Sequence, residues 1–387
     1  MLPEYRITAG FMPLTDSLLL VIAREKGFAA AEGIDLTLVR ETSWANIRDR
    51  IAVGHFDVAH MLAPMPIAAN LGLIPIAAPM IVPLALGLGG NAVTVSMALW
   101  ERMKAANAPD DLSPAPVGAA LAQAIASTEQ KLRLAVVHQH SGHNYELRYW
   151  LAASGIEPDR QVDIIVLPPP LMADALEAGR IDGYCVGEPW NSVAVARGVG
   201  RIATLKAAIW PLSPEKVLGV TEGWAAHNAQ ALAALLRALY RAAQWCGDTK
   251  NHAEAAQLMS HRNYLGVPPT EISRALSGRI EVSRGTVMDF EDFFVPAAHH
   301  ATFPSVTYAM WFYSQMVRWG DVAHTAGNVE LARATFRPDL YRSALATLID
   351  DNPPADAAPL GRDSFFDSKP FDPDDVRNYI ASQRPYV

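Results

Sequence analysis

The sequence predicts an α/β fold made of two lobes, each with its own sheet. Predicted helices and strands alternate along the chain, and one arrangement of them occurs twice. The composition agrees, because 50% of the 387 residues are hydrophobic, which is enough for a large buried core. A chain of this length also favours two or three domains over one.

The first arrangement lies at the start of the chain and is a strand–helix–strand–helix–strand run. Gly27 follows its first helix in the position after a helix end that glycine favours. Ser43 precedes its second helix as a candidate N-cap. The predicted elements are a strand at Arg6–Gly10, a helix at Asp16–Lys26, a strand at Leu36–Glu41, a helix at Trp44–Val53 and a strand at Val58–Leu62.

The second arrangement repeats the first in type and in spacing. Gly54 and Asp57 stand three residues apart before a strand, and so do Gly179 and Asp182. Pro64 and Pro189 each follow the aspartate by seven residues and are predicted to open a helix. A repeat of about 50–60 residues in two copies indicates paired lobes rather than a solenoid. The second set is a helix at Arg148–Ser154, a strand at Asp163–Leu167, a helix at Leu171–Ala178 and a strand at Tyr184–Val186.

The remaining segments carry less information about function. Ala105–Thr128 is predicted to be a loop leading to a surface helix, and Ala225–Trp245 a helix. Met288–Gly320 is dense in aromatic residues, which favours core and inter-helix packing. The Pro- and Asp-rich tail, Asp351–Val387, is predicted to wrap around the rest of the molecule.

Charge, cysteine content and hydropathy exclude several classes of protein. The net charge of −8 argues against a direct nucleic-acid surface. Without a run of about 18 apolar residues, no membrane span is expected. Cys185 and Cys246 are too few for a disulfide framework or a four-cysteine zinc site. The start of the sequence lacks the pattern of a secretory leader, so we expect a cytoplasmic protein. The alternative is a periplasmic protein whose leader was removed.

Two polar segments follow predicted strands and are candidate sites. Ser43–Asn46 begins a helix, and His143 stands where the segment after the strand Leu132–Val137 opens another. Helix N-termini bind anions through free N–H groups and the helix dipole. The His138 and His140 imidazoles could instead be metal ligands, although no carboxylate or thiol stands near them in sequence.

Two further segments are open to more than one interpretation. Gly187, at the end of a strand, would let a ligand approach the backbone. Cys185 could be a nucleophile paired with His143, but no orienting third group is evident, and a buried strand cysteine is usually inert. Lys216 follows the second repeat, where the chain would return to the first lobe; alone, it could equally face solvent.

Several of these motifs together resemble the nitrate- and bicarbonate-binding proteins of ABC importers. The resemblance runs from about Arg6 to Cys246, and more weakly to Gly320. It implies a two-lobed, type II periplasmic-binding-protein fold that closes on a small planar oxyanion. The implied division is 1–90 in lobe one, 91–209 in lobe two, and 210–387 in lobe one with a C-terminal helical region and tail. The motifs are Ser43–Asn46 with Arg48 and Asp49, Ala59–Pro66, Arg148–Ala153, Pro168–Pro170 and Cys185–Asn191.

Carried over residue by residue, the resemblance implies a pocket of Trp44, Asn91, His143, Gly187 and Lys216. In bicarbonate-binding relatives an acidic residue stands at the place of Lys216, and calcium accompanies the anion. A lysine there suits nitrate or nitrite without a metal. An ammonium 4 Å from an anion contributes about 4 kcal/mol at an effective dielectric of 20. We therefore expect an electropositive niche inside an acidic molecule, with no metal and no cofactor.

The resemblance implies two possible roles for such a pocket. The absent leader favours a cytoplasmic nitrate/nitrite sensor, which holds an RNA-binding antiterminator protein and releases it when the anion binds. The alternative is the binding subunit of a nitrate/nitrite importer, whose partner is an ABC permease, with bicarbonate a less favoured ligand. Enzymes with this architecture, the thiamine-pyrimidine synthases, carry a cysteine-rich motif, whereas Cys185 stands alone here, so no enzymatic activity is expected.

Overall fold

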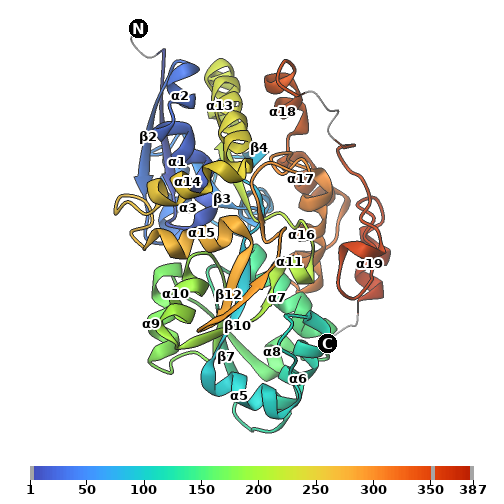
Figure 1. Ribbon diagram of the computed structural model, residues 1–387. Helices are drawn as coiled ribbons and strands as arrows, with labels where there is room; N and C mark the ends of the chain where they lie inside the picture. Colours follow the sequence, from blue (N-terminus) through green and yellow to red (C-terminus); the bar gives the residue numbers. More distant parts are fainter. Residues whose placement is uncertain (1–3, 350–353, 384–387) are drawn as a thin grey trace.

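The computed structural model describes residues 4–349 and 354–383 and contains two five-stranded sheets, one in each lobe (Figure 1). The first sheet has the order β2-β1-β3-β11-β4 and the second the order β10-β6-β9-β7-β8. The first sheet consists of β1 (Tyr5–Phe11), β2 (Ile34–Arg40), β3 (Val58–Leu62), β4 (Met80–Ala85) and β11 (Lys216–Thr221). The second consists of β6 (Asn91–Ser96), β7 (Leu132–Val136), β8 (Val162–Val166), β9 (Gly183–Gly187) and β10 (Gly200–Leu205).

The predicted repeat is confirmed by the pairing of these strands. β1 pairs in parallel with β2 and β3, and β7 pairs in parallel with β8 and β9. The repeated aspartates accept equivalent hydrogen bonds in both sheets. Asp57 Oδ2 accepts the Thr8 N–H, and Asp182 Oδ2 accepts the Arg133 N–H, each at 2.8 Å. Each aspartate therefore ties the turn before its strand to the first strand of its unit.

Serine caps begin the two helices that carry candidate site residues. Ser43 Oγ accepts the Asn46 N–H at the start of α3 (Trp44–Ala52), and Ser141 Oγ accepts the Asn144 N–H at the start of α7 (Gly142–Ala153). α7 thus begins in the segment around His143 that was predicted to open a helix, and it continues through the predicted helix at Arg148–Ser154 as far as Ala153. The predicted helix at Asp16–Lys26 is shorter than expected, because a 3-10 turn at Thr15–Ser17 (η1) precedes α1 (Leu18–Glu25).

The other helices cover the sheets or form the C-terminal region (Figure 1). Helices between the strands are α2 (Phe28–Ala31), α4 (Pro64–Asn70), α5 (Met97–Ala105), α6 (Pro114–Ala126), α8 (Pro158–Gln161), η2 (Pro169–Leu171), α9 (Met172–Glu177), α10 (Trp190–Arg197) and α11 (Lys206–Ile209). After β11 follow α12 (Glu222–His227), α13 (Ala229–Gly247), η3 (Thr249–Asn251), α14 (His252–Met259), α15 (Pro269–Ser277), α16 (Val306–Arg318), α17 (Ala326–Thr335), α18 (Pro338–Leu345), η4 (Arg362–Ser364) and α19 (Val376–Ser382).

The loop and helix predicted at Ala105–Thr128 are confirmed, because residues 106–113 form a loop that leads to α6, one face of which is buried. Two predicted elements differ from the structure in detail. The helix predicted at Ala225–Trp245 is interrupted at Asn228, between α12 and α13. Pro189 precedes α10 rather than standing in its first turn.

The chain after β11 contacts both sheets, whereas the sequence analysis assigned it to lobe one. A hairpin of β12 (Arg279–Ser283) and β13 (Thr286–Asp289) packs against α10 and β10. Within it, Ser283 Oγ accepts a hydrogen bond from Arg201 of β10 at 2.9 Å. Figure 1 shows the C-terminal part along one side of both lobes. We keep the three-part division of the chain as a proposal, with this hairpin attached to the second lobe.

The predicted aromatic packing lies where α16 meets the second lobe. Trp311 is fully buried and contacts the rings of Trp210, Tyr149 and Phe365, with centroid distances of 4.5, 5.7 and 5.9 Å. Tyr149 also donates its hydroxyl hydrogen to Asp367 at 2.6 Å. The described part of the predicted tail therefore does pack on the molecule; residues 351–353 and 384–387 of it lie outside the described residues.

Two segments cross between the lobes and bring them into contact. One passes through β5 (Leu88–Gly89), which pairs with β14 (Phe294–Val295), and the other through α11. Gly89 has a positive φ, and a Cβ there would lie 2.3 Å from the Phe293 carbonyl oxygen, so only glycine fits. Across the gap, the Trp190 indole N–H donates to the Pro13 carbonyl at 3.0 Å. These contacts join the two lobes.

Candidate functional site

The five residues of the predicted pocket lie at the ends of elements that meet between the lobes. Trp44 and His143 stand in the first turns of α3 and α7, and Asn91 and Lys216 begin β6 and β11. Gly187 ends β9 and pairs with Asn91. All five are buried. The site is therefore assembled from both sheets.

Lys216 is completely buried and ion-paired. Its Nζ lies 2.8 Å from Asp16 Oδ2 and 2.8 Å from Glu215 Oε1. The same ammonium lies 5.6 Å from the centroid of the Trp44 ring, within the range of a cation–π interaction. Lys216 thus faces the interior and not bulk water, and its charge is shared with two carboxylates.

Glu215 connects the lysine to the second lobe. Its carboxylate pairs with Lys206 of α11 and lies 3.3 Å from His143 Nδ1. Lys206 Nζ also lies 3.0 Å from Glu146 Oε1 on α7. A Cβ on Gly142 would lie 2.5 Å from Glu215 Oε2, so glycine lets this carboxylate reach the first turn of α7. A built-in carboxylate therefore stands where the sequence analysis expected a bound anion.

Asp16 connects the lysine to the rest of the predicted pocket. Its Oδ1 lies 3.0 Å from His60 Nε2, and His60 Nδ1 accepts the Met12 N–H at 3.3 Å. A His60 ring that accepts at Nδ1 carries its proton on Nε2, the nitrogen that lies near Asp16. The rings of His60 and Trp44 are 5.4 Å apart. Gly187 faces Asp16 and Asn91, since a Cβ there would lie 3.3 Å from Asp16 Oδ2 and 3.0 Å from Asn91 Oδ1.

Several polar atoms in this site have no hydrogen-bond partner among the described residues. Four of them are nitrogens of three predicted pocket residues, namely Trp44 Nε1, Asn91 Nδ2 and the two ring nitrogens of His143, one of which carries an N–H when the ring is neutral. Buried polar groups are nearly always paired, and an unpaired one costs about 1–3 kcal/mol. Unpaired donors beside an ammonium are the arrangement that a small oxygen-rich anion would satisfy.

Burial and neighbouring charges set the protonation of the site. Burial alone would raise the pKa of Asp16, but Lys216 and His60 outweigh it and hold that pKa below its usual range. In the same way, His143 and the two lysines overcome burial and lower the pKa of Glu215. Burial lowers the pKa of His143 to about 3 and raises that of Glu146 to about 8. At neutral pH two lysines therefore face two carboxylates, with His143 and Glu146 neutral.

This balance corrects the expectation of an electropositive niche. Of the charged residues in the site, only Lys216 was predicted from the sequence; the others are Asp16, Glu215, Lys206 and Glu146. Glu215 directly precedes Lys216 in the sequence, and Asp16 falls in the predicted first helix, so only their contacts in the folded molecule reveal their role. The site has both cations and anions, and its selectivity depends on how a ligand rearranges them.

The alternatives that the sequence left open have little support here. His140 Nδ1 lies 2.8 Å from the Tyr145 hydroxyl. Within residues 4–349 and 354–383, no group of three His, Cys, Asp or Glu residues could hold a metal ion. Burial raises the pKa of Cys185 well above its usual value, which leaves a thiol and not a nucleophilic thiolate.

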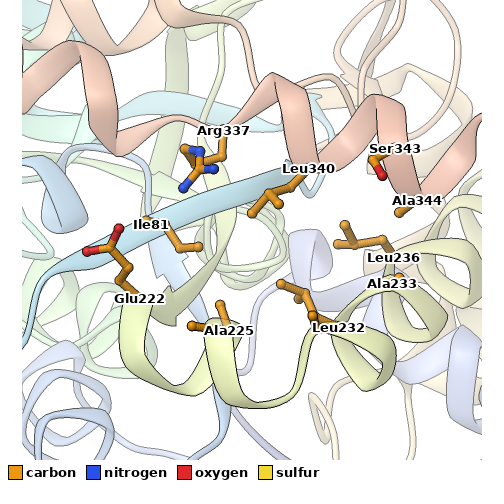
Figure 2. Close-up of a pocket in the computed structure, with 12 residues that line it drawn as sticks. Ile81, Glu222, Ala225, Leu232, Ala233, Leu236, Arg337, Leu340, Ser343 and Ala344 are labelled. Atoms are coloured by element: carbon orange, nitrogen blue, oxygen red, sulfur yellow. The ribbon is translucent and has the colours of Figure 1, made fainter.

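A separate cavity of about 300 Å³ lies away from this site, between α12–α13 and α18 (Figure 2). Alanine and leucine side chains line most of it, and Glu222 and Arg337 stand at one end. Arg337 is already paired with Asp339, at 2.6 Å. The cavity therefore lacks the buried donors and cations of the site between the lobes.

Gly187→Ala tests whether the space beside Gly187 is used by a ligand. The new Cβ would crowd Asn91 and Asp16, so we expect anion affinity to fall at least tenfold, or about 1.4 kcal/mol, with folding retained. Calorimetry with nitrate measures the loss. Gly223→Ala is the matched control, because a Cβ there meets nothing within 4 Å. Unchanged affinity in Gly187→Ala would place the ligand elsewhere.

Comparison with known proteins identifies the class and then the family. A crystal structure of the periplasmic nitrate-binding protein NrtA from Synechocystis PCC 6803 matches with a TM-score of 0.89 and 28% identity, covering 99% of this chain and 100% of that one. The chain therefore has the two-lobed fold of periplasmic binding proteins. A family model described as NMT1-like matches residues 2–260. The chain belongs to the NMT1-like family.

Curated relatives cover almost the whole chain. It is 32% identical to the nitrate/nitrite binding protein NrtA of Synechococcus elongatus, over 98% of this chain and 86% of the relative. It is 34% identical to the nitrate import ATP-binding protein NrtC of Synechocystis, over 98% of this chain and 55% of NrtC. It is 36% identical to the bicarbonate transport ATP-binding protein CmpC of Synechococcus elongatus, over 90% of this chain and 50% of CmpC. The chain thus spans about half the length of these two ATP-binding relatives.

Proposed function

We propose that this chain binds nitrate or nitrite between its lobes as the substrate-binding component of an ABC importer. The observation that carries the proposal is the buried Lys216 ammonium beside pocket residues whose N–H donors have no partner, Trp44, Asn91 and His143. A planar anion with three acceptor oxygens would satisfy an ammonium and several N–H groups at once. The proposed ligand-binding residues are Trp44, Asn91, His143, Gly187 and Lys216.

The importer is favoured over the cytoplasmic sensor that the sequence analysis preferred. The relatives compared above are named as nitrate or bicarbonate import or binding proteins, and the matching crystal structure is of a periplasmic protein. The partners we propose are accordingly an importer's permease and ATP-binding subunits. Neither the antiterminator partner nor a cytoplasmic location draws support from these relatives. Among the described residues, no helix is both long and apolar enough to cross a bilayer.

Bicarbonate is the second candidate ligand, because CmpC is as similar in sequence as the nitrate-related proteins. Lys216 favours nitrate or nitrite. The family resemblance implies that bicarbonate binders have an acidic residue at this place and bind calcium with the anion, whereas the ammonium of a lysine needs no metal. Asp16 and Glu215 beside it are the features that favour bicarbonate, since a carboxylate accepts a hydrogen bond that bicarbonate can donate and nitrate cannot.

Calorimetry separates these candidates. Nitrate has four heavy atoms, and a ceiling of about 1.5 kcal/mol per atom allows roughly 6 kcal/mol, or a Kd of tens of micromolar. We expect nitrate or nitrite to bind near this limit, and chloride and sulfate to bind far more weakly. Binding of bicarbonate with calcium, and of neither nitrate nor nitrite, would contradict the proposal. Pull-down of an importer's permease, compared with that of an antiterminator, tests the proposed partner.

A further inference from the structure

The site between the lobes holds its own charges in balance before any ligand enters. Lys206 and Lys216 are the cations, and Asp16 and Glu215 are the anions; each of the four is at most 4% exposed. Glu146 of α7 also lies 3.0 Å from Lys206 Nζ, but burial raises its pKa to about 8, so it adds no charge at neutral pH. They form a continuous chain, in which Asp16 contacts Lys216, Lys216 contacts Glu215, and Glu215 contacts Lys206. A monovalent anion added to this chain would leave one uncompensated negative charge in a buried place, which is strongly unfavourable.

A proton taken up with the anion would restore the balance, and His143 is the group best placed to accept it. Asp16 Oδ1 lies 3.0 Å from His60 Nε2 and Asp16 Oδ2 pairs with Lys216, and Glu215 pairs with two lysines. His143 is fully buried, and neither of its ring nitrogens has a hydrogen-bond partner among the described residues. Its Nδ1 lies 3.3 Å from Glu215 Oε1, so a charged imidazole would gain that carboxylate as a partner.

The charges that face His143 come from three elements. Lys216 begins β11 and Glu215 directly precedes it, Lys206 stands on α11 and Asp16 on η1; the carboxylates favour a charged ring and the lysines oppose it. With no ligand present these effects do not overcome burial, so the ring is neutral. A bound anion beside Lys216 would offset the lysines. The negative charge of the ligand would thus favour the protonated, positively charged form of the His143 ring.

We propose that His143 takes up one proton when the oxyanion binds, so that the lobes close on an anion and a proton together. This inference rests on the proposed function and assigns the pocket histidine the role of proton acceptor. Because the complex holds one more proton than the free protein, binding tightens as the pH falls. For each unit by which the pH is lowered, the Kd of nitrate is expected to decrease by up to tenfold. Nitrate itself keeps one charge across neutral pH, so the protein is the source of this dependence.

The direct test is calorimetry of nitrate binding at pH 7.5 in Bis-Tris and in Tris, two cationic buffers with different ionisation enthalpies. Proton uptake makes the measured heats differ by the number of protons taken up per nitrate, at most one, multiplied by the difference between those enthalpies. His143→Gln keeps an N–H donor but cannot be protonated, so we expect weaker binding with proton uptake near zero. His227→Gln, at an exposed position on α12, is the matched control and is expected to retain the uptake.

Equal heats in the two buffers for the wild type would overturn the inference while leaving nitrate binding intact. Full proton uptake in His143→Gln would also overturn it, since another group would then be the acceptor. Absence of nitrate and nitrite binding in the wild type would instead overturn the proposed function, and the inference with it. If His143→Gln does not fold, the NMR chemical shifts of the His143 ring nitrogens in the ¹⁵N-labelled wild type test the inference instead. They are expected to change from values of a neutral ring to values of a protonated ring when nitrate is added, and unchanged shifts would overturn the inference.

Discussion

Lys216→Met is expected to abolish measurable nitrate binding. The lysine supplies the ammonium nearest to Trp44, and its loss removes about 4 kcal/mol of attraction, or roughly a thousandfold in Kd. The loss is made worse because Asp16 and Glu215 stay behind with less positive charge to balance them. Calorimetry with nitrate measures the effect. Lys216→Glu is expected to be equally inactive.

Two further variants separate the loss of binding from a loss of folding. Removing one partner of a buried ion pair costs about 3–5 kcal/mol, so Lys216→Met is expected to unfold at lower temperature. The double variant Asp16→Asn with Lys216→Met removes an opposite pair and is expected to regain stability without regaining nitrate binding. Lys250→Met, at an exposed position, is expected to bind as the wild type does. Nitrate binding by Lys216→Met within tenfold of the wild type would contradict the proposed site.

Trp311→Ala is expected to lower the free energy of unfolding by about 3–5 kcal/mol, the usual cost of removing a large buried aromatic side chain. Trp311 is fully buried among Trp210, Tyr149 and Phe365, and its indole N–H donates to the Tyr379 hydroxyl at 3.1 Å. The change would thus leave a cavity where the C-terminal region meets the second lobe. Urea denaturation followed by circular dichroism measures it.

Two substitutions calibrate this result. Trp311→Phe keeps a ring but loses the hydrogen bond to Tyr379, so its effect should be intermediate. Leu331→Ala removes an exposed side chain from α17 and is expected to change stability by less than about 0.5 kcal/mol. A Trp311→Ala protein as stable as Leu331→Ala would show that the aromatic cluster does not hold the C-terminal region in place.

Much of the fold could be predicted from the sequence because its signals are local and occur twice. Gly54 and Gly179 both adopt a positive φ, and Asp57 and Asp182 both bind the first strand of their unit. Such turns depend on a few neighbouring residues, so they can be predicted from the spacing of those residues in the sequence. The attachment of the β12–β13 hairpin to the second lobe was missed, because it depends on packing between segments distant in sequence.

The candidate site was only partly predictable for the same physical reason. Trp44, His143 and Gly187 stand at helix starts or a strand end, positions that motifs reveal. Asp16 is different, because it belongs to the site through its ion pair with Lys216, which lies 200 positions further along the chain. An electropositive niche was expected from Lys216 alone. The carboxylates brought in by folding make the site neutral, which no spacing in the sequence indicates.

A crystal structure of the protein grown with saturating nitrate tests the central claim most directly. The proposal predicts a planar anion between the lobes, with an oxygen within hydrogen-bond distance of Lys216 Nζ and others accepting from Trp44 Nε1, Asn91 Nδ2 or His143. Density for nitrate only outside this site, with Lys216 still held by Asp16 and Glu215 alone, would contradict it.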